Sequence, residues 1–171
     1  TPMVRRAVAK QIGAVCAVAD SQEQLAKVVP LYKELAMDDQ NESVRLLALE
    51  RSAQMAESLK NVNPILDVVK PQFQELSWRV RNSVVKNFGA LARACGPEIT
   101  NAQLCPLLPP LLVDPEAEVR LTICGQLVEV CNIVGAAEFR STCMSSLMAL
   151  VEQPEEDPRI RAGAANAIMH A

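Results

Sequence analysis

The chain has 171 residues, and its 17 basic and 20 acidic residues give a formal net charge of −3 and a pI near 5.3. This balance is opposite to the basic footprint of nucleic-acid-binding proteins. No apolar run reaches the length of a membrane span without a proline or a charge. We therefore expect neither nucleic acid nor a membrane as a partner. Hydrophobic residues make up 50% of the chain but aromatics only 3%, so Leu, Val, Ala and Cys must form the core.

The dipeptide Val-Arg, once with Ile in place of Val, returns along the chain at nearly even spacing. Its copies are Val4-Arg5, Val44-Arg45, Val80-Arg81, Val119-Arg120 and Ile160-Arg161. The intervals between them are 40, 36, 39 and 41 residues. A period of that length is typical of helical solenoids, in which helix pairs of roughly 40–47 residues stack on one another. Such proteins present extended surfaces to partners, so the period favours a scaffold over an enzyme.

Each copy opens an apolar helix. Hydrophobic residues recur at offsets 0, 4, 8, 11, 12 and 15 from the Val or Ile. These offsets follow one face of an α-helix and predict a helix of about five turns. Ser52 is the polar exception on that face. At offset 11 stand Val15, Met55, Leu91, Val130 and Ala171. Leu91 and Val130 are therefore expected in the core.

A first helix precedes each of the later Val-Arg helices. In chain order, we expect one from Ser21 with Gln24 in a capping box, one with Asn63 as N-cap before Pro64, and one from Thr100. A fourth first helix is expected around Phe139. The residues expected on the buried apolar faces of the four helices are Leu25-Val28-Tyr32-Leu35, Ile65-Val68-Val69-Phe73-Leu76, Leu104-Leu107-Leu108-Leu111 and Phe139-Cys143-Leu147-Leu150.

Proline and glycine punctuate these helices. Pro30, Pro71 and Pro106 lie inside first helices and should bend them, since proline removes a hydrogen bond and crowds the carbonyl four residues back. Gly96 and Gly135 come just after second helices, where a left-handed C-cap is expected.

The patterns predict an all-α fold, an α-α superhelix of antiparallel helix pairs forming one solenoid over residues 1–171. Its expected parts are a second helix at 1–20, whole repeats at 21–60, 61–96 and 97–135, and an incomplete repeat at 136–171. Neither end carries the polar capping repeat that solenoids need for solubility. We therefore expect the sequence to be a piece of a longer array.

The chain shows little that resembles catalytic or metal chemistry. Its one histidine is His170, and its six cysteines form no Cys-x-x-Cys pair. Cys16, Cys95 and Cys131 stand at apolar offsets of the Val-Arg helices, which predicts that they are buried thiols in a reducing compartment. Cys124 and Cys131 share a helix face but supply only two of the four ligands that zinc needs. We expect no catalytic residues, no cofactor and no metal.

The recurring arginines favour a structural role. Arg45 and Arg120 can reach Asp39 and Asp114 in their own or neighbouring turns, and so stitch the repeats together. The charges that do not recur are better candidates for binding, namely Arg6 and Arg79, together with Trp78, the only tryptophan. Arginine and tryptophan are common at binding hot spots. The alternative for Trp78 is that it simply fills the helix turn.

Several strings carry a family resemblance. An acidic residue stands six positions before the Arg in most copies, as Asp39, Glu75, Asp114 and Glu155. With the first-helix proline, this resembles the HEAT repeat. The strings at 1–7, 43–48, 77–81, 96–100 and 116–120 are similar to the scaffolding A subunits of protein phosphatase 2A, in the order of that family's middle repeats. The match is good over 1–135 and weak over 136–171.

The resemblance implies a non-catalytic scaffold in the cytoplasm, with the nucleus left open. Regulatory (B-type) subunits would dock along the turns between the two helices of each repeat, and the catalytic subunit on later repeats outside this chain. The residues that this implies as protein-binding are Pro2, Arg5, Arg6, Asp38, Asp39, Trp78, Arg79, Glu116 and Glu118. A nuclear-transport receptor segment is the alternative, and a HEAT-like glycosylase is a further one that the net acidity disfavours.

One turn departs from the family pattern. Pro71 lies only ten residues before Arg81, whereas Pro30 and Pro106 lie fifteen and fourteen before their arginines. Either the turn is tighter here or residues are missing from it. The short spacing also predicts that Glu75 lies within the first helix.

Overall fold

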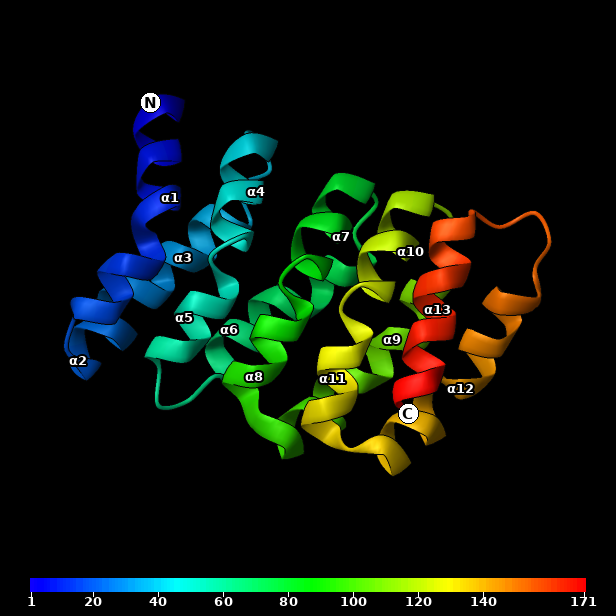
Figure 1. Cartoon of the computed structure of the whole chain (residues 1–171). Coiled ribbons are helices and arrows are strands. Elements are labelled where there is room, and N and C mark those ends of the chain that lie inside the picture. Colours follow the sequence, from blue (N-terminus) through cyan, green and yellow to red (C-terminus); the bar gives the residue numbers. More distant parts are fainter. The chain divides into compact units, whose positions relative to one another are not determined.

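The computed structural model describes all of residues 1–171, and every regular element in it is helical (Figure 1). The Val-Arg helices are α1 (Pro2–Val18), α4 (Glu42–Leu49) with α5 (Ser52–Ser58), α7 (Trp78–Val85) with α8 (Phe88–Ile99), α10 (Ala117–Cys124) with α11 (Leu127–Val134), and α13 (Pro158–His170). The all-helical prediction is confirmed.

The first helices are more segmented. They comprise α2 (Ser21–Glu23), η1 (Gln24–Val28) and α3 (Val29–Ala36); α6 (Asn63–Val69) and η2 (Lys70–Gln74); η3 (Thr100–Leu104), η4 (Cys105–Leu107) and α9 (Leu108–Leu112); and the unbroken α12 (Ala136–Glu152). Here η1 and η3 are π-helical, and η2 and η4 are 3₁₀-helical.

The helices form two compact units, residues 1–87 and 88–171. In the first unit α1 packs on α4 and α5, α4 packs on α3 and α7, and α3 packs on α6. In the second unit α11 packs on α8 and α12, while α13 packs on α10, α11 and α12. Each unit thus has second helices side by side, covered by first helices. The single unbroken solenoid stays a prediction.

The predicted five-turn second helix is wrong for three of the copies. α1 is continuous, but the helices break at Arg51, Asn87 and Gln126, each seven residues after the Val of its copy. At all three positions the backbone N–H donates to a carbonyl three residues back, at 2.9, 3.1 and 2.9 Å. A tight turn of this kind ends an α-helix, and the chain restarts in a new direction.

Prolines explain the segments of the first helices. Pro30, Pro71 and Pro106 each lie in the first turn of a new segment, where the missing N–H is not needed. Before Pro30, the N–H of Val29 bonds the carbonyl of Gln24, five residues back, in a π turn. Cys105 bonds Thr100 in the same way before Pro106. The wider turn relieves the crowding that proline causes in a regular α-helix.

Two details of the predicted first helices are wrong. The N-cap of the helix at 21 is Asp20, whose carboxylate accepts from the N–H groups of Gln22 and Glu23 at 2.9 Å. The π turn then shifts the buried face by one residue. Gln24 is therefore buried and donates to the carbonyl of Cys16 at 2.7 Å, whereas Leu25 is exposed.

The remaining first-helix starts differ slightly. The N-cap before Pro64 is Val62, one residue earlier than the predicted Asn63. Thr100 does not begin a helix, because helical structure continues from Pro97 immediately after Gly96. Instead, buried Thr100 donates its hydroxyl to the carbonyl of Ala92 at 2.9 Å.

Gly96 and Gly135 have the positive φ that the sequence predicts, +77° and +90°. Their ψ values of 171° and 152° are extended, so the conformation differs from a left-handed helical cap. This region of backbone space is essentially restricted to glycine. Each glycine turns the chain from a second helix directly into the next first helix.

The predicted core positions at offsets 0, 4, 8, 11 and 12 are confirmed in the three middle copies, whereas at offset 15 Cys95 and Val134 are only half-buried. Leu91 and Val130 are buried, with 1% and 0% exposure, and so is the polar exception Ser52. In the first copy the same positions are less covered, since Val4 and Val15 are exposed. Burial of these positions therefore depends on the neighbouring helix pair, as nearest-neighbour stacking requires.

Candidate functional site

Arg5, Arg45 and Arg120 each connect a second helix to the turn of the following repeat. Arg5 donates from Nε to Asp38 Oδ2 at 2.9 Å and from Nη1 to Glu34 Oε1 at 2.6 Å. Arg120 holds both carboxylate oxygens of Glu156, each at 2.8 Å. Arginine is suited to this role because its planar group binds carboxylates through two donors. The predicted structural role is confirmed for these pairs.

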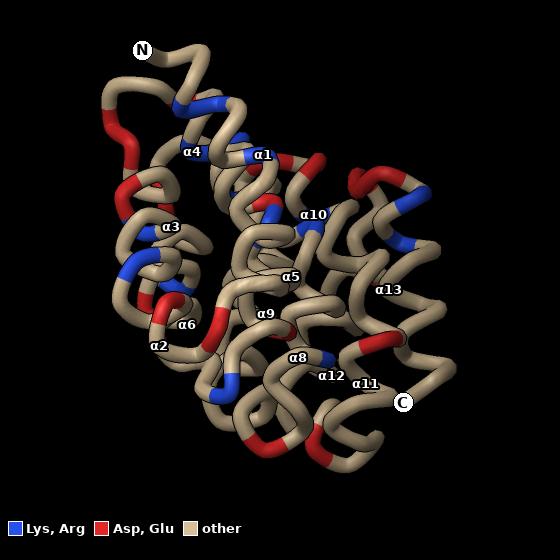
Figure 2. The backbone as a smooth tube through the Cα atoms, turned by 90° about the vertical axis from the view of Figure 1, so that its left-hand side faces the viewer, with Lys and Arg blue, Asp and Glu red and all other residues tan.

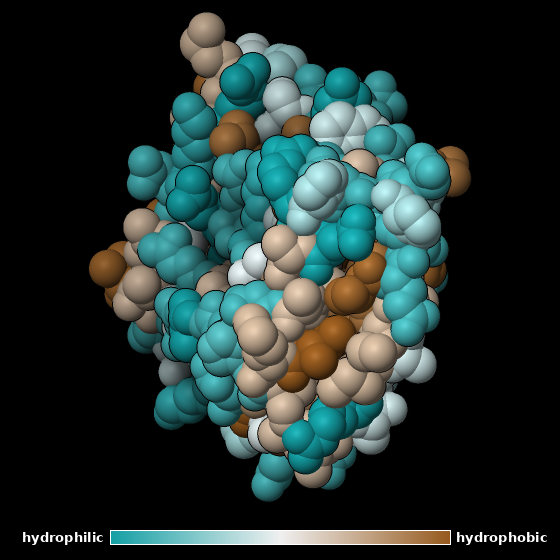
Figure 3. Space-filling view, turned by 45° about the vertical axis from the view of Figure 1, so that its right-hand side comes forward, coloured by the Kyte–Doolittle hydropathy of each residue, from teal (hydrophilic) through white to brown (hydrophobic).

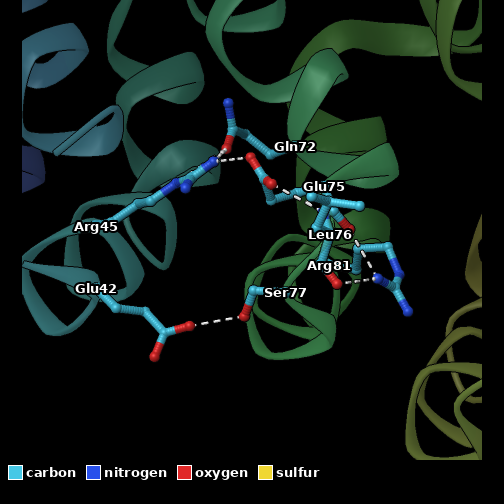
Figure 4. Close-up of polar contacts among 7 residues, drawn as sticks. All are labelled: Glu42, Arg45, Gln72, Glu75, Leu76, Ser77 and Arg81. Atoms are coloured by element: carbon cyan, nitrogen blue, oxygen red, sulfur yellow. Dashed lines mark hydrogen bonds and ion pairs between the residues drawn. The ribbon is translucent and has the colours of Figure 1, made fainter. Parts of the chain in front are cut away.

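The same junction recurs at the shortened turn (Figure 4). Arg45 donates to Gln72 Oε1 at 2.6 Å and forms an ion pair with Glu75. One residue beyond the exposed Leu76, the hydroxyl of Ser77 donates to Glu42 Oε1 at 2.6 Å. The turn of one repeat is therefore held from the preceding repeat on both of its sides.

We call Arg5, Arg45 and Arg120, together with the acids that they bind, the ladder. Its acids are not all those that the sequence predicts. Arg5 binds Asp38, which is buried, whereas Asp39 is exposed. In the last turn the partner is Glu156 instead of Glu155. Glu75 lies outside the first helix, contrary to the expectation, and is the carboxylate that Arg45 reaches. A one-residue difference in turn length decides which acid faces the arginine, and periodicity does not resolve it.

Arginine partners change the titration of these acids. Burial alone would raise the pKa of Asp38, but hydrogen bonds from Arg5 and from the backbone N–H of Gln40 outweigh it and lower the pKa. The hydrogen bond from Arg45 lowers the pKa of Glu75, and that from Arg120 lowers the pKa of Glu156. The ladder acids are therefore charged at neutral pH.

Eight of the nine residues predicted to bind partners fall into two groups. Most are exposed at the turn ends of second helices: Pro2, Arg6, Asp39, Arg79, Glu116 and Glu118. Arg5 and Asp38 differ, because they are bonded to each other and Asp38 is only 6% exposed. Asp38 also accepts from the N–H groups of Gln40 and Asn41 at 3.0 Å and so shapes its own turn. These two residues hold the fold and offer little to a partner.

Trp78 is half-buried at the start of α7. The guanidinium carbon of Arg79 lies 5.0 Å from the centre of its ring, which is a cation–π contact. Because Arg79 itself is exposed, the pair forms a surface that combines aromatic and cationic character. Trp78 therefore both fills the turn and remains partly accessible.

A second basic surface lies on α1. Pro2, Met3, Arg6, Ala7 and Lys10 line a shallow hollow near the start of that helix. Figure 2 shows basic residues on this part of α1. In the first unit α1 packs on α4 and α4 packs on α7. The starts of the three helices lie along one edge (Figure 1), so Arg6 and the Trp78–Arg79 pair share that edge, with the start of α4 between them.

Comparison with known proteins agrees with a fold of helical repeats. Residues 97–169 match the model of the PPP2R1A-like HEAT repeat. Over 102 residues the chain is 35% identical to the regulatory A subunit of protein phosphatase PP2A from Schizosaccharomyces pombe, covering 57% of this chain and 17% of that protein. Crystal structures of two engineered proteins share the fold at a TM-score of 0.67, with 15% and 14% identity, over 99% of this chain and 74% and 44% of theirs.

Residues 97–169 of this chain are similar to HEAT repeats. The family match runs through residues 136–169, a region where the sequence motifs predict only a weak resemblance. Similarity to a phosphatase regulatory subunit agrees with a non-catalytic protein. The chain spans about a sixth of the length of that relative.

The chain exposes apolar residues at its turns that the sequence reasoning missed. Met37 follows α3, Leu76 lies between η2 and α7, and Val113 follows α9. All three are exposed, Leu76 to 95%. The predicted buried face includes Leu76, and that prediction is wrong because η2 ends at Gln74. The short spacing between Pro71 and Arg81 could have predicted the exposure of Leu76, because it leaves too few residues for another helical turn that would bury this side chain.

Apolar side chains are also exposed elsewhere. Val15 and Leu31 are exposed in a groove between α1 and the first helix that follows it, and the half-buried Val8 and the buried Ile12 and Val28 complete its lining. In the second unit Met148 on α12 and Met169 on α13 are exposed. Figure 3 brings forward the side on which these two helices lie and shows an apolar strip bordered by hydrophilic side chains.

The thiols of the chain are mostly in its core. All six cysteines are free, and Cys95 is the one that is only half-buried, contrary to the prediction for it. Burial raises the pKa of Cys95, Cys105 and Cys124 to about 11, and that of Cys143 to about 12. Thiols with such pKa values are poor nucleophiles at neutral pH.

The structure places no metal-binding or membrane-spanning feature in the chain. No group of three or more His, Cys, Asp or Glu side chains is arranged to hold a metal ion. The helices lack the combination of length and apolar character that crossing a membrane requires. His170 is exposed, and its Nδ1 lies 2.8 Å from the carbonyl of Asn166, four residues back on the same helix.

Proposed function

We propose that this chain is part of a non-catalytic scaffold that holds the regulatory and catalytic subunits of a protein serine/threonine phosphatase 2A together. The similarity to a regulatory A subunit of PP2A supports the class of complex. The observation that carries the docking site is the division of the cations in the first unit. Arg5 and Arg45 are bonded within the ladder, whereas Arg6 and Arg79 are exposed along one edge.

Along this edge a regulatory (B-type) subunit would contact two turns at once. Arg6 on α1 and the Trp78–Arg79 pair on α7 offer a cationic contact and an aromatic contact, separated by the start of α4. Replacing a buried interface arginine or tryptophan by alanine often costs about 2 kcal/mol or more of binding free energy. A partner that spans both turns gains from each.

The acidic turns complement this pattern. Asp39 lies at the turn before α4, and Glu116 and Glu118 lie at the start of α10. Within each unit, these exposed carboxylates would select partners that present basic groups, since like charges brought together oppose binding. The catalytic subunit would dock on repeats that follow this chain in the full-length protein.

The test is co-purification with the full-length protein. The tagged full-length scaffold is incubated with purified phosphatase catalytic subunit and, separately, with each B-type regulatory subunit from the same organism. We expect stable complexes with the catalytic subunit and with at least one regulatory subunit, measured by size-exclusion chromatography with light scattering. Failure to bind any of them, with the scaffold shown to be folded by circular dichroism, would exclude the proposed function.

A further inference from the structure

Leu76 is the most exposed large hydrophobic side chain of the chain, at 95%. It is the middle residue of the short connection 75–77, between the end of η2 and the start of α7. Burying a leucine side chain removes its apolar surface from water and is favourable. A partner that buried this side chain would gain binding free energy.

The backbone around Leu76 is fixed on both sides. Its N–H donates to Glu75 Oε1 at 2.8 Å, and its carbonyl accepts from Nη1 of Arg81 at 3.0 Å. Arg81 also bonds the carbonyl of Glu75 at 2.7 Å. Three of the four backbone groups that flank the side chain are thus in hydrogen bonds within the turn.

Two contacts from the preceding repeat hold the same turn. Arg45 binds the carboxylate of Glu75, and Glu42 accepts the hydroxyl hydrogen bond of Ser77 (Figure 4). The residues before and after Leu76 are therefore anchored to α4, and the Leu76 side chain projects from between the anchors. A group held in its bound position before association loses less conformational entropy when a partner binds.

The surroundings of Leu76 define what it fits. Glu75, Arg45 and Glu42 are engaged with one another or with Ser77 within the protein. Two residues from Leu76 stands Trp78, with Arg79 stacked on its ring. A partner that approaches this turn meets the aliphatic side chain of Leu76, the aromatic ring of Trp78 and the exposed cation of Arg79. The complementary surface is an apolar pocket with a carboxylate at its rim.

We propose that Leu76 is the anchor by which a regulatory subunit recognises this scaffold, inserted into an apolar pocket that has a carboxylate at its rim, with Glu42 and Arg45 as positioning residues. This inference rests on the proposed function and names a contact within it. The short connection places Leu76 directly between the two residues that α4 holds, Glu75 and Ser77.

The first experiment measures the dissociation constant of the full-length scaffold for the B-type subunit that it binds. Leu76→Ala should weaken binding about tenfold or more, and Leu76→Met should remain within about threefold, because methionine fills an apolar pocket of similar size. Val18→Ala is the matched control, an aliphatic residue that is 87% exposed at the far end of α1. Wild-type affinity of Leu76→Ala, with the thermal midpoint unchanged, would overturn the proposal.

A second experiment tests the positioning role. Ser77→Ala removes the bond to Glu42 without altering the core, and it should weaken binding about threefold or more in the parent protein. In the Leu76→Ala background the same change should have little further effect, because the group that it positions is gone. Equal effects in both backgrounds would show that Glu42 does not act through Leu76. If the parent scaffold binds no phosphatase subunit at all, the proposed function itself fails. If the parent scaffold binds the subunit and Leu76→Ala binds it equally well, only the proposed role of Leu76 as the anchor fails.

Discussion

Arg120 and Glu156 face each other through two parallel hydrogen bonds, Nε to Oε2 and Nη2 to Oε1, each 2.8 Å long. The remaining Nη1 donates to the carbonyls of Asp114 and Pro115 at 2.6 and 3.2 Å, in the turn that precedes its own helix. One guanidinium therefore joins two successive turns of the second unit. The same chemistry recurs in the first unit at Arg5 and Arg45.

Breaking this pair should be costly. Arg120→Ala leaves the Glu156 carboxylate, whose side chain is 5% exposed, without its cation. We expect a loss of about 3 kcal/mol in the free energy of unfolding, measured by urea denaturation. Arg159→Ala is the control, because Arg159 is exposed and pairs with Asp157 two residues away, and it should change stability by no more than about 0.5 kcal/mol. Equal effects of the two changes would contradict the structural role of the ladder.

The ladder also predicts the response to acid. The folded-state pKa values of Asp38, Glu75 and Glu156 are lowered from the ordinary values of 3.8, 4.5 and 4.5. A lowered pKa gives stability that is fully present above the ordinary pKa and is lost as pH falls through the folded one. The urea midpoint should therefore be constant from neutral pH to about 5 and fall below about 4.5. In Glu156→Gln the fall should be shallower, and an unchanged slope would count against this pair.

A core prediction separates the two units. Leu91→Ala in α8 removes a side chain that is 1% exposed and should cost about 2–5 kcal/mol. The only tryptophan lies in the first unit, so its fluorescence reports on that unit, while circular dichroism reports on all helices. The dichroism transition should move to lower urea by more than the fluorescence transition. Met169→Ala, at an exposed position of α13, should shift neither.

Thiol reactivity should follow burial. At neutral pH we expect slow labelling of Cys16, Cys105, Cys124, Cys131 and Cys143 by a thiol reagent, because burial raises the pKa of each thiol. The pKa of Cys95 is raised as well, but this residue is only half-buried, so the reagent should reach it first. Mass spectrometry of peptides after timed labelling measures the order. Rapid native labelling of all six, at the rate seen in denaturant, would show that the core is not as described.

The turn edge should carry binding without carrying the fold. Arg6→Ala and Trp78→Ala in the full-length scaffold should each weaken a regulatory subunit's binding by about 2 kcal/mol. Arg6→Ala should leave the thermal midpoint unchanged, and Trp78→Ala should lower it slightly because the ring is half-buried. Binding of the catalytic subunit should not change. If loss of binding only parallels loss of stability, both residues are structural.

The residues that sequence reasoning places well are those fixed by local periodicity. Leu91, Val130 and Phe139 are buried as predicted, because helical spacing decides which side of a helix they occupy. Helix breaks and ladder partners are not predictable in this way. The break at Arg51 involves neither glycine nor proline, and the choice of Asp38 over Asp39 depends on how the turn meets Arg5. Such features are settled by contacts between repeats, which a single period does not describe.

The π turns at Gln24–Val28 and Thr100–Leu104 each hold one residue more than an α turn of the same shape. Deleting one residue there would restore a regular helix and leave the apolar faces on both sides in place. The same deletion inside the unbroken α12 would rotate half of its buried face by about 100°. A regular helix would, however, bring the ring of Pro30 or Pro106 back against a carbonyl. Across related sequences, loss of the extra residue and loss of the proline should therefore occur together.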